Sequence, residues 1–410
     1  MKIKSETFRA LQIVEFRYFT IARLFITIGA LMQAVIVGWQ VYELTRDPFS
    51  LGLIGLAEAI PAILTALISG HIVDTSDRKK ILLSSFILMF LCTFSLLLIS
   101  TDSIFVLAHH KVFAIYSVIF ISGIARGFSM PSAFAFLSQL VPREIFPNAI
   151  TWNTSTWQIG AVTGPAVGGL IYGYFGVTMS YGLVALMALI AIAGITVISK
   201  KPIPPIPENQ SLGERVSAGI KFVFKNKIIL SAMSLDMFAV LFGGAVAMLP
   251  IFAGEILLVG AQGLGFLRAA PSVGAAIMAL VLTRKPPTNN AGRNLLICVT
   301  GFGLCIIVFA ISRNFILSLF ALALSGMFDS VSVIIRQTII QLKTPENMKG
   351  RVSAVNSIFI GSSNEIGAFE SGLAAKLMGV VPSVIFGGAM TIIVVLSIMF
   401  ASPSLRKLKL

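Results

Sequence analysis

The sequence predicts an all-α membrane protein in which twelve transmembrane helices form two pseudo-symmetric six-helix bundles. Composition is the first reason, because 56% of the 410 residues are hydrophobic, only 12% are charged and the mean hydropathy is +0.93. Such values exclude an ordinary soluble protein. The second reason is that the apolar residues come in stretches of about 20 or more, the length that a helix needs to cross hydrocarbon. The third is an internal repeat that relates the two halves of the chain.

The apolar stretches define the expected spans in order along the chain. They cover residues 19–45, 50–73, 81–100, 112–140, 148–172, 178–199, 228–256, 261–283, 294–312, 315–342, 352–377 and 381–401. The alternation typical of membrane-barrel strands is absent from them, which favours helices. We therefore expect an N-terminal bundle at 1–199, a cytoplasmic linker at 200–227 and a C-terminal bundle at 228–410.

The expected linker has two parts. Residues 200–210 are rich in proline and should be extended. The segment that follows opens with a capping box formed by Ser211 and Glu214 and carries apolar residues at helical spacing. This pattern predicts an amphipathic helix on the cytoplasmic membrane surface.

The repeat is visible as matched glycines, prolines and asparagines. At an offset of 203 residues, Pro142 falls on Pro345, Asn153 on Asn356, Gly164 on Gly367, Gly169 on Gly372 and Gly176 on Gly379. At an offset of 210, Gly55 falls on Gly265 and Pro61 on Pro271. The halves are therefore related, and repeats of this kind place a substrate site at their interface.

The charge distribution indicates a membrane topology rather than a nucleic-acid partner. The net charge is +14, but most lysines and arginines lie at the termini and in every second connection. The other connections hold only Arg46, Lys111, Arg313 and Lys376. By the positive-inside rule both termini are cytoplasmic. The three cysteines lie in apolar segments without metal-ligand spacing, so we expect no metal site and no cofactor.

A glycine-rich segment at 158–171 stands out within the fifth span. Its members are Gly160, Gly164, Pro165, Gly168 and Gly169. Each interior glycine costs a soluble helix about 1 kcal/mol and a proline about 3 kcal/mol. In a membrane, glycines four residues apart instead give a flat strip on which another backbone can lie closely.

Ionisable residues within spans are costly, so each is a functional candidate. Asp236 in span seven and Glu370 in span eleven are the first candidates for proton coupling, followed by Glu365. We treat them as unpaired acids. A low dielectric disfavours the charged form of an unpaired carboxyl group, so the group can take up a proton on one side of the membrane and release it on the other. A purely structural hydrogen-bonding role is the alternative.

Charged residues at related positions suggest ion pairs. Asp329 and Arg336 are two turns apart and share a helix face. The repeat makes Arg126 equivalent to Asp329, and Glu58 equivalent to Arg268, which suggests ion pairs related by pseudo-symmetry. Pairing is the least costly way to keep charge in lipid, so we expect a structural or gating role.

Polar and aromatic residues within the spans are candidates for the substrate cavity, where amides and rings suit an amphipathic ligand. Trp39 and Trp157 have an alternative role at the membrane interface. The candidates are Gln33, Trp39, Gln40, Asn153, Trp157 and Asn364.

The connection at 70–82, GHIVDTSDRKKIL, resembles the loop signature G-x-L-A-D-R-x-G-R-K-x-x-L of the major facilitator superfamily. Gly70, Asp74, Arg78, Lys79 and Leu82 match it, whereas Thr75 and Asp77 replace the usual Arg and Gly. The resemblance implies a gate latch made by Asp74 and Arg78. Similarly, the segment 158–171 resembles the motif G-x-x-x-G-P-x-x-G-G. Within that superfamily, this motif is associated with exporters that work by antiport.

Four further segments indicate one branch of the superfamily. Segments 37–56, 142–153, 344–358 and 362–379 are similar to the enterobactin-exporter and macrolide-efflux branch of the superfamily. This implies an inner-membrane transporter, monomeric and embedded in the lipid bilayer, that exports a small organic molecule by alternating access, driven by proton antiport. A metal-ion or lysolipid carrier of the same fold is the alternative. An enzyme is not expected, because motifs for a nucleophile elbow, zinc-type histidines and a phosphate-cradling loop are absent from the sequence.

Overall fold

A computed structural model describes residues 8–101, 110–202, 212–243, 245–284, 290–345, 348–406 and 408, and all regular secondary structure in these ranges is helical. The long helices are α2 (Val14–Thr45), α3 (Pro48–Thr75), α4 (Arg78–Ser100), α6 (Lys111–Leu140), α7 (Phe146–Thr196), α9 (Lys227–Phe242), α11 (Gly260–Arg284), α12 (Ala291–Ile311), α13 (Phe315–Lys343), α14 (Lys349–Met378) and α15 (Val380–Ala401). Shorter helices are α8 (Leu212–Lys225), α10 (Ala245–Ile251) and α16 (Pro403–Arg406). The prediction of an all-α membrane protein is confirmed.

Every predicted span lies on one or more helices. Among the described residues, ten segments are long and apolar enough to cross a membrane. One of them, at 143–196, contains two predicted spans. The remaining predicted span is α14, which has 30 residues but is more polar than the others. Span seven is discontinuous, since α9 ends at Phe242, α10 follows, and Phe252–Ile256 is a π-helix.

Glycine makes the break inside α7. Gly176 has φ 79° and ψ 179°, a conformation that side-chain-bearing residues rarely adopt. Gly379 has φ 91° and ψ 157° where α14 gives way to α15. These are the glycines that the 203-residue offset matched. The repeat therefore recurs as the same backbone bend between consecutive spans in each half.

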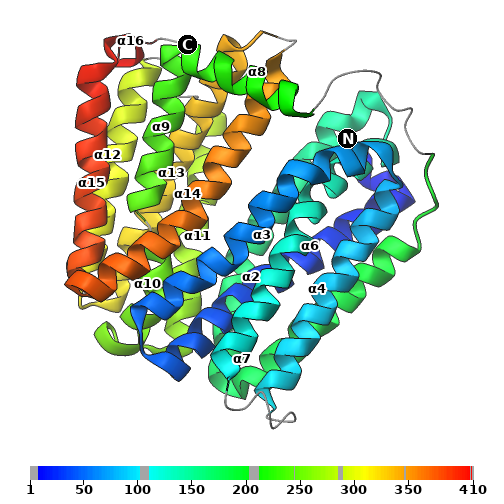
Figure 1. Ribbon diagram of the computed structural model, residues 1–410, viewed down its shortest axis with the longest axis horizontal. Coiled ribbons are helices and arrows are strands. Elements are labelled where there is room, and N and C mark those ends of the chain that lie inside the picture. Colours follow the sequence, from blue (N-terminus) through cyan, green and yellow to red (C-terminus); the bar gives the residue numbers. More distant parts are fainter. Residues whose placement is uncertain are drawn as a thin grey trace. The chain divides into compact units, whose positions relative to one another are not determined.

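The chain divides into two compact units. The first contains residues 1–44 and 57–207, and the second contains 45–56 and 208–410. Residues 45–56 include the start of α3. They belong to the second unit, whereas the rest of α3 belongs to the first. Figure 1 shows α9, α12, α13 and α15 as neighbouring helices of the second unit, in agreement with their contacts.

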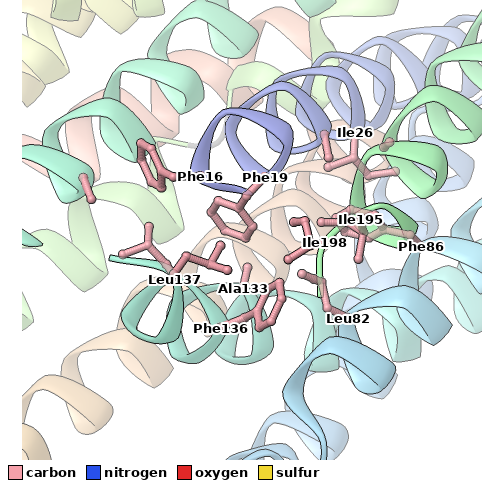
Figure 2. Close-up of a cluster of buried hydrophobic side chains, with 14 of the residues drawn as sticks. Phe16, Phe19, Ile26, Leu82, Phe86, Ala133, Phe136, Leu137, Ile195 and Ile198 are labelled. Carbon is pink, nitrogen blue, oxygen red and sulfur yellow. The ribbon is translucent and has the colours of Figure 1, made fainter. Parts of the chain in front are cut away.

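Each unit has its own apolar core. In the first unit, Phe16 and Phe19 of α2 meet Phe136 of α6 and Phe86 of α4, all at most 1% exposed (Figure 2). In the second unit a separate buried cluster joins α9, α12 and α13. The side chains of these cores are buried between helices. Large apolar side chains such as that of Phe320 are instead exposed on the outside, where they suit contact with lipid.

The same close backbone contacts occur in both units. A methyl group on Gly123 of α6 would lie 2.6 Å from the carbonyl oxygen of Glu58 and from the Pro61 ring of α3. A methyl group on Gly326 of α13 would lie closer still to the Pro271 carbonyl of α11. Because the repeat equates Gly123 with Gly326 and Pro61 with Pro271, it predicts a real structural correspondence.

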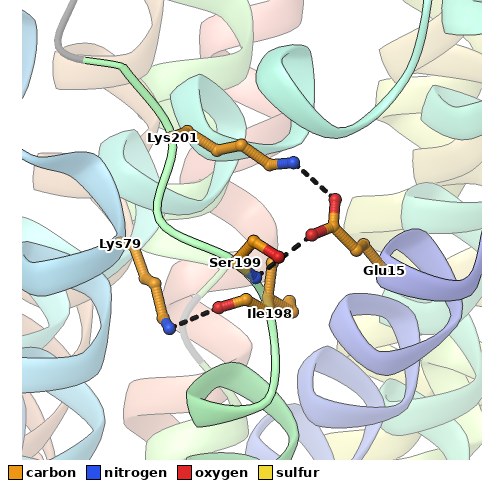
Figure 3. A network of polar contacts seen from close by, with 5 residues as sticks. All are labelled: Glu15, Lys79, Ile198, Ser199 and Lys201. Atoms are coloured by element: carbon orange, nitrogen blue, oxygen red, sulfur yellow. Dashed lines mark hydrogen bonds and ion pairs between the residues drawn. The ribbon is translucent and has the colours of Figure 1, made fainter.

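A polar network ties three helices together at one end of the first unit. Lys201 pairs with Glu15 at the start of α2, and Glu15 also accepts a hydrogen bond of 3.1 Å from the Ser199 N–H (Figure 3). Lys79 at the start of α4 donates to the carbonyl of Ile198, beyond the end of α7. The network binds the chain that leaves the first unit to the helices of that unit.

Candidate functional site

A buried ion pair lies in the second unit between α9 and α13. The guanidinium of Arg336 contacts the carboxylate of Asp236, and their side chains are only 3% and 9% exposed. Charges so far from water are tolerated only when they are paired. The expectation that Asp236 is an unpaired acid is therefore wrong. Its partner lies on a helix a hundred residues away, and periodicity within one helix cannot reveal such a contact.

A second carboxyl group belongs to the same site. Asp329 lies two turns before Arg336 on α13, and with Asp236 and Ser332 it lines a cavity of about 10 Å³. That volume has room for about one water molecule. Cys298 and Phe302 of α12 are among the apolar residues that line the cavity. Ser332 was missed by the sequence analysis, although its position one turn after Asp329 was a usable signal.

The charges of this site do not cancel. Within the described chain, Asp329 has neither a hydrogen bond nor an ion pair, and the buried Nε of Arg336 has no hydrogen-bond partner. The site therefore contains two carboxyl groups and one guanidinium, and of the two carboxyl groups the guanidinium contacts only that of Asp236. One proton, or one small cation, would make the site neutral, and a water molecule in the cavity can bridge such groups.

The first unit has an ion pair of a different kind. Arg126 of α6 contacts Glu58 of α3, as pseudo-symmetry suggests, but their side chains are 41% and 21% exposed. In the second unit the equivalent charges, Asp329 and Arg268, do not pair: Asp329 has no partner among the described residues, and Arg268 interacts elsewhere. The repeat thus preserves the positions of the charges and changes their partners.

The two other candidate acids lie on α14. Glu370 is half-buried. Glu365 lies beside Gly55, where a methyl group on the glycine would be 3.7 Å from its Oε2, and it has a further interaction of its own. Neither lines the Asp329 cavity.

The loop that carries the resemblance is fixed by backbone contacts. Arg78 donates to the carbonyl of Ala135 at 3.1 Å, and Lys79 donates to that of Thr196 at 2.9 Å. The side chain of Asp74 lies outside the described residues. The structure thus attaches Arg78 to α6 and leaves the proposed Asp74 latch untested.

Three of the candidate cavity residues have hydrogen bonds within the first unit. Gln33 accepts from Thr93 at 2.6 Å, Gln40 accepts from Tyr181 at 2.7 Å, and Trp39 donates to Glu43 at 2.8 Å. Glu43 also accepts from Tyr172. Glu43 was not singled out from the sequence, although it lies one turn after Trp39.

The other three candidates differ in exposure. Trp157 is 44% exposed, and Asn153 is half-buried. Asn364 is exposed and donates to the Ile360 carbonyl at 2.9 Å. Among the described residues, no group of three or more His, Cys, Asp or Glu side chains could hold a metal ion.

The glycine strip of α7 packs against the backbone of α2. A methyl group on Gly160 would lie 2.7 Å from Thr27, one on Gly164 would lie 2.9 Å from the Ile28 carbonyl, and one on Gly168 would lie 3.0 Å from Met32. Gly169 and Pro165 are buried in the same segment. The strip therefore sets the distance between α7 and α2, as its spacing predicted.

Comparison with known sequences identifies the family. The sequence profile of the family described as transmembrane secretion effector, within the major facilitator superfamily, matches residues 5–409. The chain belongs to this family. The resemblance inferred from the loop at 70–82 and the glycine motif is confirmed, and the family is one of transporters.

Relatives within the superfamily match nearly the whole chain. The enterobactin exporter EntS of Salmonella typhi is 25% identical over 395 residues, which cover 96% of this chain and 94% of the exporter. The enterobactin exporter of Shigella flexneri is 26% identical over 394 residues, covering 96% and 93%. These relatives belong to the branch that segments 37–56 and 362–379 resemble.

Solved transporter structures share the fold. A POT family transporter in complex with 5-aminolevulinic acid superposes with a TM-score of 0.75 at 11% identity, covering 95% of this chain and 96% of its own. A bacterial homologue of the human lysosomal transporter Spinster, in an inward-facing and unoccupied conformation, gives 0.73 at 11% identity, covering 96% of each. At such identities the likeness establishes the fold alone.

Proposed function

We propose that this transporter exports a small, drug- or siderophore-like organic molecule across the bacterial inner membrane by alternating access, in exchange for protons. Enterobactin exporters that match it over 96% of its length support the direction and the class of substrate. Two compact units with equivalent internal contacts support a mechanism in which one bundle moves against the other. The excess of basic residues in alternate connections supports cytoplasmic termini.

The proton site in this proposal is the cluster of Asp236, Asp329 and Arg336. Asp236 holds the guanidinium in place, and Asp329 borders a cavity large enough for one water molecule. When Asp329 carries a proton the cluster is neutral, and when it does not the cluster has one negative charge. A proton loaded from outside and released inside would switch the cluster to the neutral state and back in each cycle. Glu370 and Glu365 remain the further candidates for coupling.

The ion pair of Glu58 and Arg126 has a gating role in this proposal, together with Asp74 and Arg78. The contact joins α3 and α6, and its partial exposure lets water compete for both groups. A pair of this kind can open and close at a low free-energy cost. The buried pair of Asp236 and Arg336 in the second unit cannot open at so low a cost. Burial suits a proton site, because such a site must stay closed to other protons between proton uptake and proton release.

The direct test is transport into everted membrane vesicles, with enterobactin and a lipophilic cationic dye as separate probes. An acid-inside gradient should drive uptake of at least one probe, and a protonophore should abolish it. Asp329→Asn should retain binding of that probe but lose its dependence on the gradient. Glu144→Gln, which changes an exposed carboxylate, is the matched control. Uptake by the wild-type protein that ignores the pH gradient would contradict proton antiport.

A further inference from the structure

The amphipathic helix α8 is fixed to the second unit by one face. A methyl group on Gly219 would lie 2.8 Å from the carbonyl oxygen of Arg351 in α14, so the two backbones are in close contact. Val223, one turn later, is fully buried in a cluster with Val352 and Ile229. Figure 1 shows that α8 lies at the end of the second unit where α16 also lies.

The opposite side of α8 exposes apolar and basic residues in separate stripes. Ile220 and Phe224 are one turn apart and are 39% and 59% exposed. Lys221 and Lys225, also one turn apart, follow on the next stripe and are exposed. A helix with this arrangement lies in the plane of the membrane interface, where its apolar residues enter the acyl boundary and its lysines face the headgroups.

A cleft of about 430 Å³ opens beside this helix. It is lined by Phe222, Lys225, Asn226, Lys227, Ile228 and Ser404. Among the described residues no acid lines it, and neither Lys225 nor Lys227 has a hydrogen-bond or ion-pair partner there. The Asn226 side-chain oxygen is used to cap α9 by accepting from the Ile229 N–H at 3.3 Å, which leaves its amide NH₂ as a donor. The cleft thus combines two free ammonium groups, further donors and an apolar wall.

We propose that this cleft binds the headgroup of an anionic phospholipid. The phosphate would lie between Lys225 and Lys227, with the Asn226 amide and the Ser404 hydroxyl as further donors. Phe222 and Ile228 would contact the glycerol and the first acyl carbons. Charge complementarity favours an anionic ligand, and the exposed Ile220 and Phe224 hold the cleft at headgroup depth. The inference rests on the membrane fold and not on the direction of transport or its driving ion.

Lipid titration of the purified, full-length protein in neutral detergent tests the proposal. The probe is fluorescently labelled phosphatidylglycerol, with labelled phosphatidylcholine measured in parallel. Wild-type protein should bind phosphatidylglycerol in preference. The double variant K225Q/K227Q should bind it about thirtyfold more weakly, since each lysine near a membrane surface contributes about a factor of five. K225R/K227R, which keeps both charges, should bind like the wild type.

A matched control separates the cleft from general surface charge. R143Q/K343Q removes two exposed basic residues outside the cleft and should leave the affinity unchanged. Equal binding of the lipid by wild type and K225Q/K227Q would overturn the proposal, as would equal affinity for the two lipids. Displacement of the labelled lipid by millimolar inorganic phosphate would instead assign the cleft to a free anion. Loss of transport has no bearing on these outcomes, so the proposed function and the lipid site fail independently.

Discussion

Breaking the ion pair between Asp236 and Arg336 should destabilise the protein strongly. Asp236→Leu leaves a guanidinium that is 3% exposed without its carboxylate, and Arg336→Met leaves a carboxylate that is 9% exposed without its guanidinium. Removing one partner of a buried pair costs about 3–5 kcal/mol. Replacing both by apolar residues of similar volume is nearly neutral, so the double variant should lie within about 1 kcal/mol of the wild type.

The two single variants should respond differently to pH. Acid should restore part of the unfolding free energy in one of them and none in the other. In Arg336→Met the stranded carboxylate can take up a proton, so its destabilisation is complete at high pH and shrinks as the pH falls. In Asp236→Leu the guanidinium stays charged at every accessible pH, and acid brings no recovery. Asp329 remains in both variants. Arg336→Met therefore keeps two carboxyl groups and no guanidinium, whereas Asp236→Leu keeps one of each.

Unfolding of the purified protein in neutral detergent, followed by tryptophan fluorescence from pH 5 to pH 8, measures these effects. The double-mutant cycle gives the coupling between the two residues directly. The reasoning is refuted if either single variant is as stable as the wild type. It is also refuted if the double variant is less stable than both single variants, because the pair would then be a net contributor and not a compensated charge.

Three further outcomes are expected. Gly164→Ala should cost about 1–3 kcal/mol of unfolding free energy, because its methyl group would lie 2.9 Å from the α2 backbone, whereas Gly182→Ala, with nothing within 4 Å, should cost nothing. Glu15→Gln should lower the unfolding free energy by at most about 1 kcal/mol, since its pair with a lysine is partly exposed. Membrane-impermeant maleimide should label Arg313→Cys in spheroplasts and Lys200→Cys only in everted vesicles, and the reverse pattern would invert the topology; the native cysteines are buried.

The fold was predictable because its signals are local or periodic. A span needs about 20 consecutive apolar residues, and each of the twelve stretches located by this requirement lies on helical structure. Glycine conformations were also accessible: Gly176 and Gly379 were matched by the repeat, and each proves to bend the chain between two spans. Helix boundaries within span seven were not predictable, because the break between α9 and α10 interrupts no apolar pattern.

The site was only partly predictable, because its contacts cross between helices. Composition marked Asp236, Asp329 and Arg336 as costly charges in apolar helices, and burial of the ion pair bears that out. Which acid faces the arginine depends on the rotation of α9 against α13. Sequence spacing fixes positions on one helix and leaves that rotation open. Asp236 was therefore placed among the unpaired acids, while Asp329 is the acid without a partner among the described residues.

The comparison of the two halves shows which features of the repeat tolerate change. Close glycine–proline contacts occur in both, at Gly123 and at Gly326, because any side chain there would separate the helices. Charges have diverged: the Glu58 pair is partly exposed, and the Asp236 pair is buried. The same pair-breaking change should therefore cost far less in the first bundle, about 1 kcal/mol for Glu58→Gln. A cost of 3 kcal/mol or more there would mean that both pairs are structural, and the assignment of proton coupling to the second bundle would lose its physical basis.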